Sequence, residues 1–331
     1  MEKLSAVLWL GIAILIAAIA APAQGSGELI ELDRAVENIV PADVHVERVA
    51  EGFKFTEGPV WIRKSGYLLF SDIPANVIDK WTPDGKVSTY LKPSGFTGTN
   101  ASGFHLVGSN GITLDRKGRV VFCASGDRAI VRIEKNGRRT VLADRYEGKR
   151  LNSPNDLVYK SDGALYFTDP SSGLLKRDNS PLKELPFDGV FLLKDGKLQV
   201  IDKSFTLPNG IAVSPDGKIL YVDDTHKMTI MRFDIQPDDT IANSHLFIYM
   251  GRDRGAGHPD GMKVDKRGDV YCTGPGGVWI ISPNGKHLGT IKTPSVLTNL
   301  AFGDADGKAL FMTTRTGELL RARLKVGGVR P

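Results

Sequence analysis

Short apolar runs recur along the chain in a pattern that predicts β-hairpins. Each run follows a polar residue, and a glycine comes eight or nine residues after that polar residue. A second apolar run follows each glycine. The runs are too short for helices and suit strands of about four to five residues. The pairs of polar residue and glycine are Glu57 and Gly66, Asn110 and Gly118, Asn155 and Gly163, Asn209 and Gly217, Asp260 and Gly268, and Asn299 and Gly307.

The hairpins belong to six copies of one repeat. The polar residues at 57, 110, 155, 209, 260 and 299 are 53, 45, 54, 51 and 39 residues apart, which is the length scale of a propeller blade. Third apolar runs such as TIMRFD and GVWIIS complete the copies. Nearly continuous apolar strands are typical of sheets covered on both faces, as stacked blades are. We therefore predict an all-β fold, a six-bladed β-propeller with four-stranded blades around a central channel, over residues 44–331.

The segments outside the repeat predict ring closure and two long loops. Val44–Ala50 alternates like a strand, and the sixth copy ends near Leu324. We expect this strand to pair with the last blade, which removes an exposed sheet edge. Residues 24–43 are interpreted as a linker with a short surface helix in LDRAVENIV. The segments Lys92–Ser109 and Leu174–Asp188 are longer than hairpins need, and such loops either carry binding residues or are plain surface excursions.

Residues 1–23 have the pattern of a secretory signal peptide. Lys3 precedes an uncharged stretch of sixteen residues from Ala6 to Ala21, and Ala21-Pro22-Ala23 forms a small-x-small cleavage site. The stretch falls short of the roughly 20 residues of a transmembrane helix. An uncleaved membrane anchor is the alternative. We expect a periplasmic or secreted protein, with no stable membrane insertion after cleavage.

Composition and cysteine placement narrow the function classes. The chain has 43 basic and 38 acidic residues and a net charge of +5, but no basic helix and no interleaved aromatic residues. We therefore expect no nucleic-acid partner. Cys123 and Cys272 fall on second strands of blades two and five, across the ring and beyond the reach of a disulfide. Two buried free thiols are predicted, and no pattern indicates the oligomeric state.

The polar residue that opens each copy is predicted to face the channel. In a propeller the inner strands line the channel, so equivalent positions return to one ring, although up to 242 residues (299 minus 57) separate them. Carboxylates that face one another are costly, and a bound cation would offset that cost. Oxygen donors without a Cys or His cluster suit a hard ion such as Ca²⁺. The alternative is that these side chains cap strand ends or bond to neighbouring backbone.

Four motifs in this order resemble the signatures of the gluconolactonase family, which includes regucalcin, the senescence marker protein. The resemblance extends from about Val44 to Leu324 and implies a six-bladed propeller with a divalent metal in its channel, usually calcium. It implies that Glu57, Asn209 and Asp260 bind the metal. It also implies that Asn155 contacts the substrate or metal-bound water, or reaches the metal itself. The motifs are EGPVW at 57–61, NSPND at 152–156, LPNGIA at 207–212 and HPDGM at 258–262.

The implied activity is the calcium-dependent hydrolysis of a sugar lactone to its aldonic acid, the reaction of a carboxylic ester hydrolase, with Mn²⁺ or Zn²⁺ as other possible metals. Two departures concern the substrate: Ser153 replaces an Arg of regucalcin-like members, and 124–126 read Ala-Ser-Gly where many bacterial members have Glu-His-Gly. Two alternatives remain, a non-catalytic propeller that binds a ligand or protein, and a related propeller esterase with a bulkier substrate. The candidate substrate-binding residues are Asn155, Asn110 and His105.

Asp260 and His258 are the candidate catalytic residues. The resemblance implies Asp260 as the general base, although a carboxylate on Ca²⁺ is a weaker base. His258 is the second candidate, because an imidazole titrates nearer neutrality. Three aspartates that end second strands either orient the ligands or cap turns. They are Asp72, Asp169 and Asp223.

Overall fold

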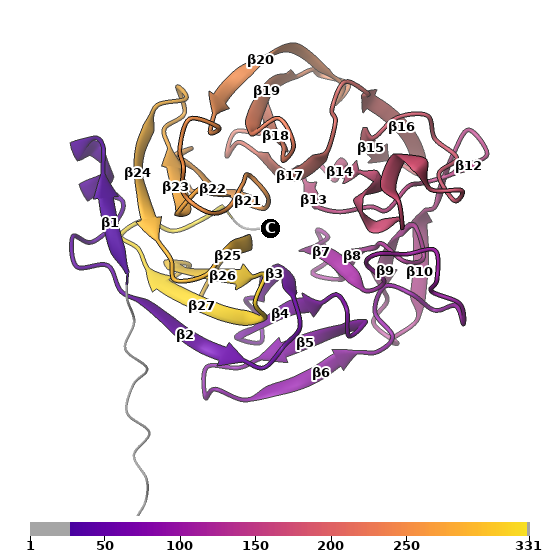
Figure 1. The fold of residues 1–331 in the computed structure, drawn as a ribbon, viewed down its shortest axis with the longest axis horizontal. Helices are drawn as coiled ribbons and strands as arrows, with labels where there is room; N and C mark the ends of the chain where they lie inside the picture. The colour runs from indigo at the N-terminus through magenta and orange to yellow at the C-terminus, as the bar shows by residue number, and fades with distance from the viewer. Residues whose placement is uncertain (1–26, 330–331) are drawn as a thin grey trace, which may run out of the picture.

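The structure, a computed structural model that describes residues 27–329, is a ring of six antiparallel sheets around a central channel (Figure 1). In each sheet the strands follow one another outward from an inner strand at the channel. The predicted six-bladed propeller with four-stranded blades is therefore confirmed. The predicted signal peptide, residues 1–23, lies outside the described residues. Within the described part of the chain, no helix is long and apolar enough to cross a membrane.

The first four blades follow the chain in order. Blade one consists of β3 (Thr56–Ile62), β4 (Tyr67–Asp72), β5 (Val77–Trp81) and β6 (Val87–Leu91). Blade two consists of β7 (Ser109–Leu114), β8 (Val120–Ala124), β9 (Ala129–Ile133) and β10 (Arg139–Ala143). Blade three consists of β13 (Leu157–Tyr159), β14 (Leu165–Asp169), β15 (Gly189–Lys194) and β16 (Lys197–Asp202). Blade four consists of β17 (Pro208–Val213), β18 (Ile219–Asp224), β19 (Thr229–Ile235) and β20 (Ile241–Tyr249).

The last two blades each include a strand from the N-terminal part of the chain. Blade five consists of β21 (Met262–Val264), β22 (Val270–Gly274), β23 (Gly277–Ile281), β24 (His287–Lys292) and, outermost, β1 (Glu28–Glu31). Blade six consists of β25 (Leu297–Gly303), β26 (Ala309–Thr314), β27 (Glu318–Arg323) and β2 (Val46–Glu51). The remaining elements are the ribbon β11 (Arg145–Tyr146) and β12 (Lys149–Arg150) and the 3-10 turns η1 (Arg34–Asn38), η2 (Ser171–Gly173) and η3 (Arg177–Asn179).

The predicted ring closure is confirmed. Strand β2 pairs antiparallel with β27, with Val46 opposite Ala322. The linker interpretation of residues 24–43 needs correction, because β1 is hydrogen-bonded to β24 as a fifth strand of blade five. The predicted short helix is the 3-10 turn η1, which packs Val36 against the core between blades five and six. This segment therefore covers the sheet edge that β24 would otherwise expose.

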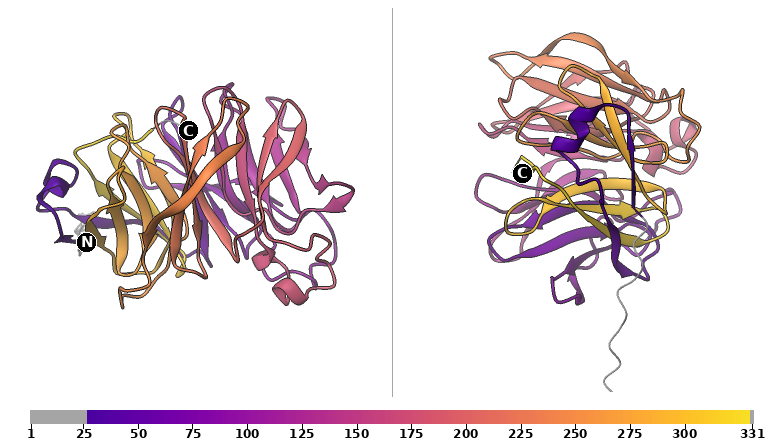
Figure 2. Two further views of the ribbon diagram at one scale, coloured as in Figure 1. Left: turned by 90° about the horizontal axis from the view of Figure 1, so that it is seen from above. Right: turned by 90° about the vertical axis from the view of Figure 1, so that its left-hand side faces the viewer.

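Chain direction separates the two faces of the ring. Every inner strand begins at one face, here called the site face, and turns into the second strand at the other, the far face. Segments 92–108 and 170–188 connect strands at the site face. In Figure 2 (left) the short helical turns of the second segment lie on the opposite side from the C-terminus. Val329, the last described residue, lines the channel at the far face.

Apolar side chains fill the space between neighbouring blades. Six buried clusters each join two adjacent blades, for example Trp61 of blade one with Phe311 of blade six, whose rings stack at 5.6 Å between centroids. Cys123 and Cys272 are buried and free, as predicted.

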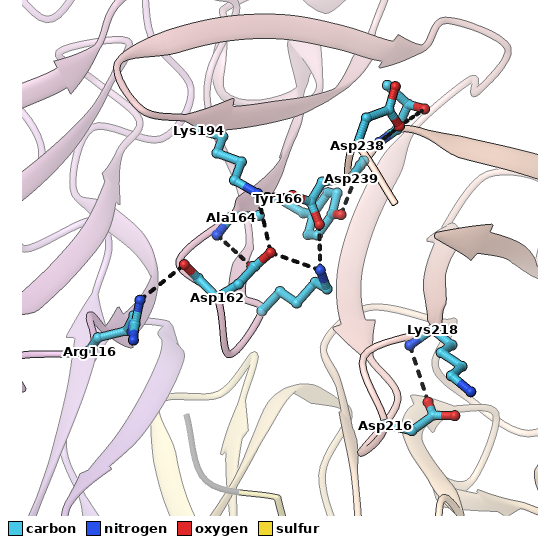
Figure 3. Close-up of polar contacts among 11 residues, drawn as sticks. Arg116, Asp162, Ala164, Tyr166, Lys194, Asp216, Lys218, Asp238 and Asp239 are labelled. Carbon is cyan, nitrogen blue, oxygen red and sulfur yellow. Dashed lines mark hydrogen bonds and ion pairs between the residues drawn. The ribbon is translucent and has the colours of Figure 1, made fainter. Parts of the chain in front are cut away.

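A network of hydrogen bonds and ion pairs joins blades two, three and four on the far face (Figure 3). Asp239, in the turn between β19 and β20, is fully buried and accepts hydrogen bonds from Lys160 (2.5 Å) and Lys194 of blade three. Asp162 accepts from Lys194 at 3.2 Å, and its backbone oxygen accepts from Arg116 of blade two at 3.1 Å. This network belongs to the scaffold, because it lies at the opposite end of the blades from the inner-strand starts.

Candidate active site

The six polar residues that open the repeats lie together at the site face. Glu57, Asn110, Asn209 and Asn299 are within the first three residues of β3, β7, β17 and β25, while Asn155 and Asp260 lie two residues before β13 and β21. All six are buried, with exposed fractions between 1% and 8%. The repeat therefore places these side chains at equivalent points of the ring, as the sequence predicted.

Glycines after four of these residues bring the inner strands very close together. An added Cβ at Gly58 would lie 2.1 Å from the backbone oxygen of Asn110, and one at Gly210 would lie 1.8 Å from that of Asp260. At Gly261 it would lie 2.1 Å from the side chain of Asn299. Glycine allows such close approach between backbones. The width of the channel at the site face therefore depends on the residue that follows each opening residue.

Asp156 interrupts this glycine pattern and supplies a third carboxylate that sequence reasoning missed. It follows Asn155 in NSPND, at the position that is Gly in four of the six copies. Asp156 is 2% exposed, and its Oδ1 would be 2.5 Å from a Cβ at Gly111 of blade two. The signal in the sequence was a carboxylate at a position that is glycine in four of the six copies.

In the channel, Asn299 of blade six contacts side chains from three other blades. Its Nδ2 donates hydrogen bonds to Glu57 Oε2 at 3.0 Å and to Asp156 Oδ2 at 3.3 Å. Lys263 of β21 donates to Asn299 Oδ1 at 3.1 Å and lies 3.9 Å from Asp156 Oδ2. Residues separated by 242 positions, Glu57 and Asn299, are therefore in direct contact. Both side chains also bond to neighbouring backbone, as the alternative expects, because Glu57 Oε2 accepts from Gly58 N at 2.6 Å and Asn299 Oδ1 accepts from Leu300 N at 2.8 Å.

Among the described residues, Lys263 and Arg315 compensate only part of the acidic character of the site face. Burial, followed by the repulsion of Asp156, raises the pKa of Glu57 to about 7. Burial and then the charges of Glu57 and Asp156 raise the pKa of Asp260 well above its usual range. The pKa of Asp223 is raised in the same way, by burial and then by Asp260 and Asp156. Lys263 lowers the pKa of Glu57 and Arg315 lowers that of Asp260, but burial and mutual repulsion outweigh both, so the metal-free site favours the protonated forms of these carboxyl groups.

Among the residues that open the repeats, two amide oxygens lack a hydrogen-bond donor in the described part of the chain. Asn209 donates through Nδ2 to Thr225 Oγ1 at 3.1 Å, and Thr225 in turn donates to the backbone oxygen of Pro259. This arrangement leaves Asn209 Oδ1 buried and without a partner among the described residues, and Asn110 Oδ1 is in the same state. A buried oxygen without a donor is costly and usually marks an ion or water that it binds.

The donor set fits a hard cation. In the described part of the chain no group of three or more His, Cys, Asp and Glu side chains is arranged to hold a metal. The oxygen donors at the site face are the carboxylates of Glu57, Asp260 and Asp156 and the Asn amides. Carboxylate and amide oxygens suit Ca²⁺ better than Zn²⁺. The unpartnered Asn209 oxygen and the raised pKa values of both carboxylates favour a cation at this point.

His258 and Arg315 line the approach to Asp260. His258 Nε2 lies 3.8 Å from Asp260 Oδ2, and burial followed by the charge of Arg315 lowers the pKa of His258. Arg315 follows β26, is exposed, and counteracts the raised pKa of Asp260. Sequence reasoning missed Arg315, because a single Arg in a polar turn carries no motif. Ser153 does not take over the role of the Arg that regucalcin-like members have at this position, because its hydroxyl is engaged with backbone. Its Oγ accepts from Gly173 N at 2.9 Å and donates to Pro170 O.

The other predicted residues have different positions. The Asn155 side chain forms no hydrogen bond with described residues, while its backbone NH donates to Thr168. His105 lines a hollow with Leu174 to Arg177 and has no hydrogen bond to Glu57 or Asp260, so its substrate contact stays a prediction. The three aspartates at second-strand ends differ. Asp72 accepts hydrogen bonds from Lys54 N and Phe55 N, and Asp169 accepts from Asn152 N at 2.7 Å. The carboxylate oxygens of Asp223 have no hydrogen-bond partner among the described residues.

The lining of the channel becomes mostly apolar towards the far face. A cavity of about 270 Å³ lies there between the ends of the inner strands. Its wall is mostly apolar and includes Trp61, Ile112, Ile211 and Phe302. Charged residues such as Asp115, Arg116 and Lys160 also line this cavity, but the opening residues of the repeats lie at the site-face end.

Comparison with known proteins identifies the family. Residues 55–316 match the family described as the SMP-30/Gluconolactonase/LRE-like region. The chain belongs to this family. Among similar SMP-30/gluconolactonase proteins, a gluconolactonase of Zymomonas mobilis is 38% identical over 313 residues, 91% of this chain and 87% of that protein. A pentonolactonase of Haloferax volcanii is 25% identical, over 79% of this chain and 82% of that protein.

A solved structure of a gluconolactonase from Xanthomonas campestris has the same fold. It superimposes with a TM-score of 0.78 and 32% sequence identity, over 92% of this chain and 96% of that chain. The resemblance that the four sequence motifs indicated is therefore confirmed.

Proposed function

We propose that the protein is a sugar lactonase of the gluconolactonase type that requires a divalent cation, Ca²⁺ first, with Mn²⁺ or Zn²⁺ as alternatives. The main support is that two buried carboxylates, Glu57 and Asp260, lie at one end of the channel with the unpartnered oxygen of Asn209. The Zymomonas mobilis and Xanthomonas campestris gluconolactonases support the substrate class. The pattern of residues 1–23 supports a periplasmic or secreted location.

Glu57, Asn209 and Asp260 would hold the cation, with Asn155 beside them. A cation bound there would polarise the lactone carbonyl and stabilise the negative charge that develops when water attacks, an effect worth several kcal/mol. With both carboxylates ionised, the ligand set carries two negative charges, which match a divalent ion. This site therefore accepts a neutral lactone and does not trap the acid that forms.

Asp260 is our first candidate for the group that takes the proton of the attacking water, and His258 is the second. The lowered pKa of His258 keeps its imidazole neutral at neutral pH, so Nε2 has a lone pair available. His258 Nε2 lies 3.8 Å from Asp260 Oδ2, which is beyond hydrogen-bond distance, so a proton would pass between the two groups only after they move closer. Asn155 and Asn110 would orient the lactone hydroxyl groups with their amides.

A panel of lactones tests the proposal. We expect purified protein with Ca²⁺ to hydrolyse at least one aldonolactone, read as a fall in pH, because each turnover releases an acid. EDTA should remove the activity and added Ca²⁺ should restore it. Aryl esters in the same panel identify a propeller esterase. Tight binding of a lactone without hydrolysis above background, with every metal tried, would show that the propeller only binds.

The stability of the metal-free protein should fall as pH rises from about 4.5 to about 7. Over this range folded Glu57 keeps a proton that the unfolded chain releases, because its pKa is raised from 4.5 to about 7. Ca²⁺ needs the ionised carboxylate, so the stabilisation by Ca²⁺ should grow with pH over the same range. Melting temperatures in EDTA at pH 5.5 and 8, for wild type and Glu57→Gln, measure the effect. An equal pH dependence in both proteins would contradict the assignment to Glu57.

A further inference from the structure

A second cavity, of about 700 Å³, lies on the site face beside the channel. Its walls come from 96–104 and 175–182, within the two long segments that interrupt the repeat, and from 126–128 and Arg150. Glu57, Asn209 and Asp260 are not among its lining residues. The cavity is therefore separate from the ring of carboxylates, and the lactonase function does not account for it.

The cavity has an aromatic wall. Phe96 and Phe104 both line it, with ring centroids 5.4 Å apart and planes inclined by 49°. Leu175, which is exposed, and Leu182 face the same space from the second segment. Asn100 and Ser102 add hydrogen-bonding groups at the wall. A mixed wall of aromatic faces and polar groups suits a ligand with both apolar faces and hydroxyl groups.

Positive charge dominates the lining. Arg128, Arg150 and Lys176 line the cavity, and Asp127 is the one acidic residue among its lining residues. Asp127 is already engaged, because its carboxylate lies 3.1 Å from Arg139 and accepts from the Thr97 NH at 2.8 Å. The cavity therefore has a surplus of positive charge for an anion.

Part of this positive charge is built into the interior. Arg128 is 6% exposed, and its Nε donates to the backbone oxygens of Leu151 at 2.5 Å and Asn152 at 3.2 Å. Its carboxylate neighbour is Glu184, at 3.7 Å and with a side chain that is 41% exposed. Arg150 donates through Nη2 to the backbone oxygen of Asp127, while its Nε is buried and has no hydrogen-bond partner among the described residues. A buried donor without an acceptor favours a bound acceptor.

We propose that this cavity binds a sugar acid, with the carboxylate on Arg150 and Lys176 and the sugar ring against Phe96 and Phe104. A guanidinium offers paired donors in the geometry that a carboxylate accepts. The acid has two possible sources: the aldonate product, which rests on the proposed lactonase function, or an acidic unit of a larger carbohydrate, which does not. Both present the same chemistry to the cavity.

Gluconate binding to the full mature protein, measured by calorimetry in EDTA, tests the inference. EDTA removes any contribution of a cation at the carboxylate ring. We expect gluconate to bind, glucose to bind much more weakly, and the double substitution Arg150→Met with Lys176→Met to weaken gluconate binding at least tenfold. Arg138→Met is the matched control, because Arg138 is an exposed basic residue of blade two that lies outside the cavity lining. This control should bind gluconate like wild type.

Two results would overturn the inference: no gluconate binding in EDTA at millimolar concentration, or equal binding by wild type and the double variant. Gluconate binding that Asp260→Asn abolishes would also overturn it, because the ligand would then occupy the channel. Lactone hydrolysis by the double variant separates the two proposals. If the double variant still hydrolyses lactone but no longer binds gluconate, the result supports the cavity as the binding site. If the wild-type protein binds gluconate in the cavity but hydrolyses no lactone, only the lactonase proposal fails. An oligouronate that binds more tightly than gluconate identifies the larger carbohydrate as the source.

Discussion

Replacing Asp260 by Asn should reduce kcat/KM for the best lactone at least a hundredfold while the protein stays folded. The substitution removes one of the two carboxylates proposed to hold the cation, and losing such a charge at the reacting centre costs about two to three orders of magnitude. The fold should tolerate the change, because burial and the charges of Glu57 and Asp156 already raise the pKa of Asp260. Neutralising this side chain relieves repulsion in the metal-free protein.

The measurement combines steady-state kinetics, Ca²⁺ titration and thermal melting in EDTA. Asp260→Asn should lose Ca²⁺ affinity as well as activity, and its melting temperature in EDTA should equal or exceed that of wild type. His258→Gln is the matched control, since His258 lies 3.8 Å from Asp260 but is not a proposed ligand. This control should keep Ca²⁺ affinity. An Asp260→Asn protein with wild-type activity would remove Asp260 from the mechanism, and inactive His258→Gln with normal Ca²⁺ binding would make His258 the base.

Replacing Gly210 by Ala should destabilise the protein by about 3 kcal/mol and abolish activity. The new Cβ would lie 1.8 Å from the backbone oxygen of Asp260 and 2.5 Å from Asp223 Oδ2. A backbone atom cannot rotate away, so β17 and the segment before β21 must separate, and overpacking of this kind costs about 1 to 3 kcal/mol or more. The separation also moves Asn209 relative to Asp260, which spreads the proposed ligands.

Denaturant unfolding and Ca²⁺ affinity measure this effect. Gly66→Ala serves as a control, because Gly66 has φ +66° and open space around its Cβ position. It should lose about 1 kcal/mol through backbone strain and keep full activity. If Gly210→Ala unfolded at the same denaturant concentration as wild type and remained active, the inner strands would not be as close as the structure shows.

Local pattern was enough to predict the blades. Each repeat is a polar residue, a short apolar run, a turn glycine and a second run, and hairpins of this kind depend on neighbours in sequence. The spacing of six copies then implied a ring, and a ring implied that Glu57, Asn209 and Asp260 lie at equivalent points. The strand 44–50 could be assigned to blade six because a propeller leaves one place for it.

Contacts between blades could not be predicted in this way. The convergence of Asn299 with Glu57 and Asp156, and the position of Lys263 beside them, depend on side chains from four blades that no local pattern relates. The segment Glu28–Glu31 resembled a linker because a short edge strand has little apolar signal, yet it pairs with β24. The basic cavity arises in the same way, since its walls come from segments that are more than 70 residues apart (175 minus 104).

The sequence by itself determined the six-bladed ring, its closure and the set of opening residues, because repeated hairpins have only one way to bury both faces of each sheet. Only the tertiary structure decided which of those residues touch, that Asp156 joins them, and that burial and repulsion raise the pKa values of Glu57 and Asp260. The physical reason is that charge and hydrogen-bond balance depend on distances across the channel, whereas strand formation depends on neighbours along the chain.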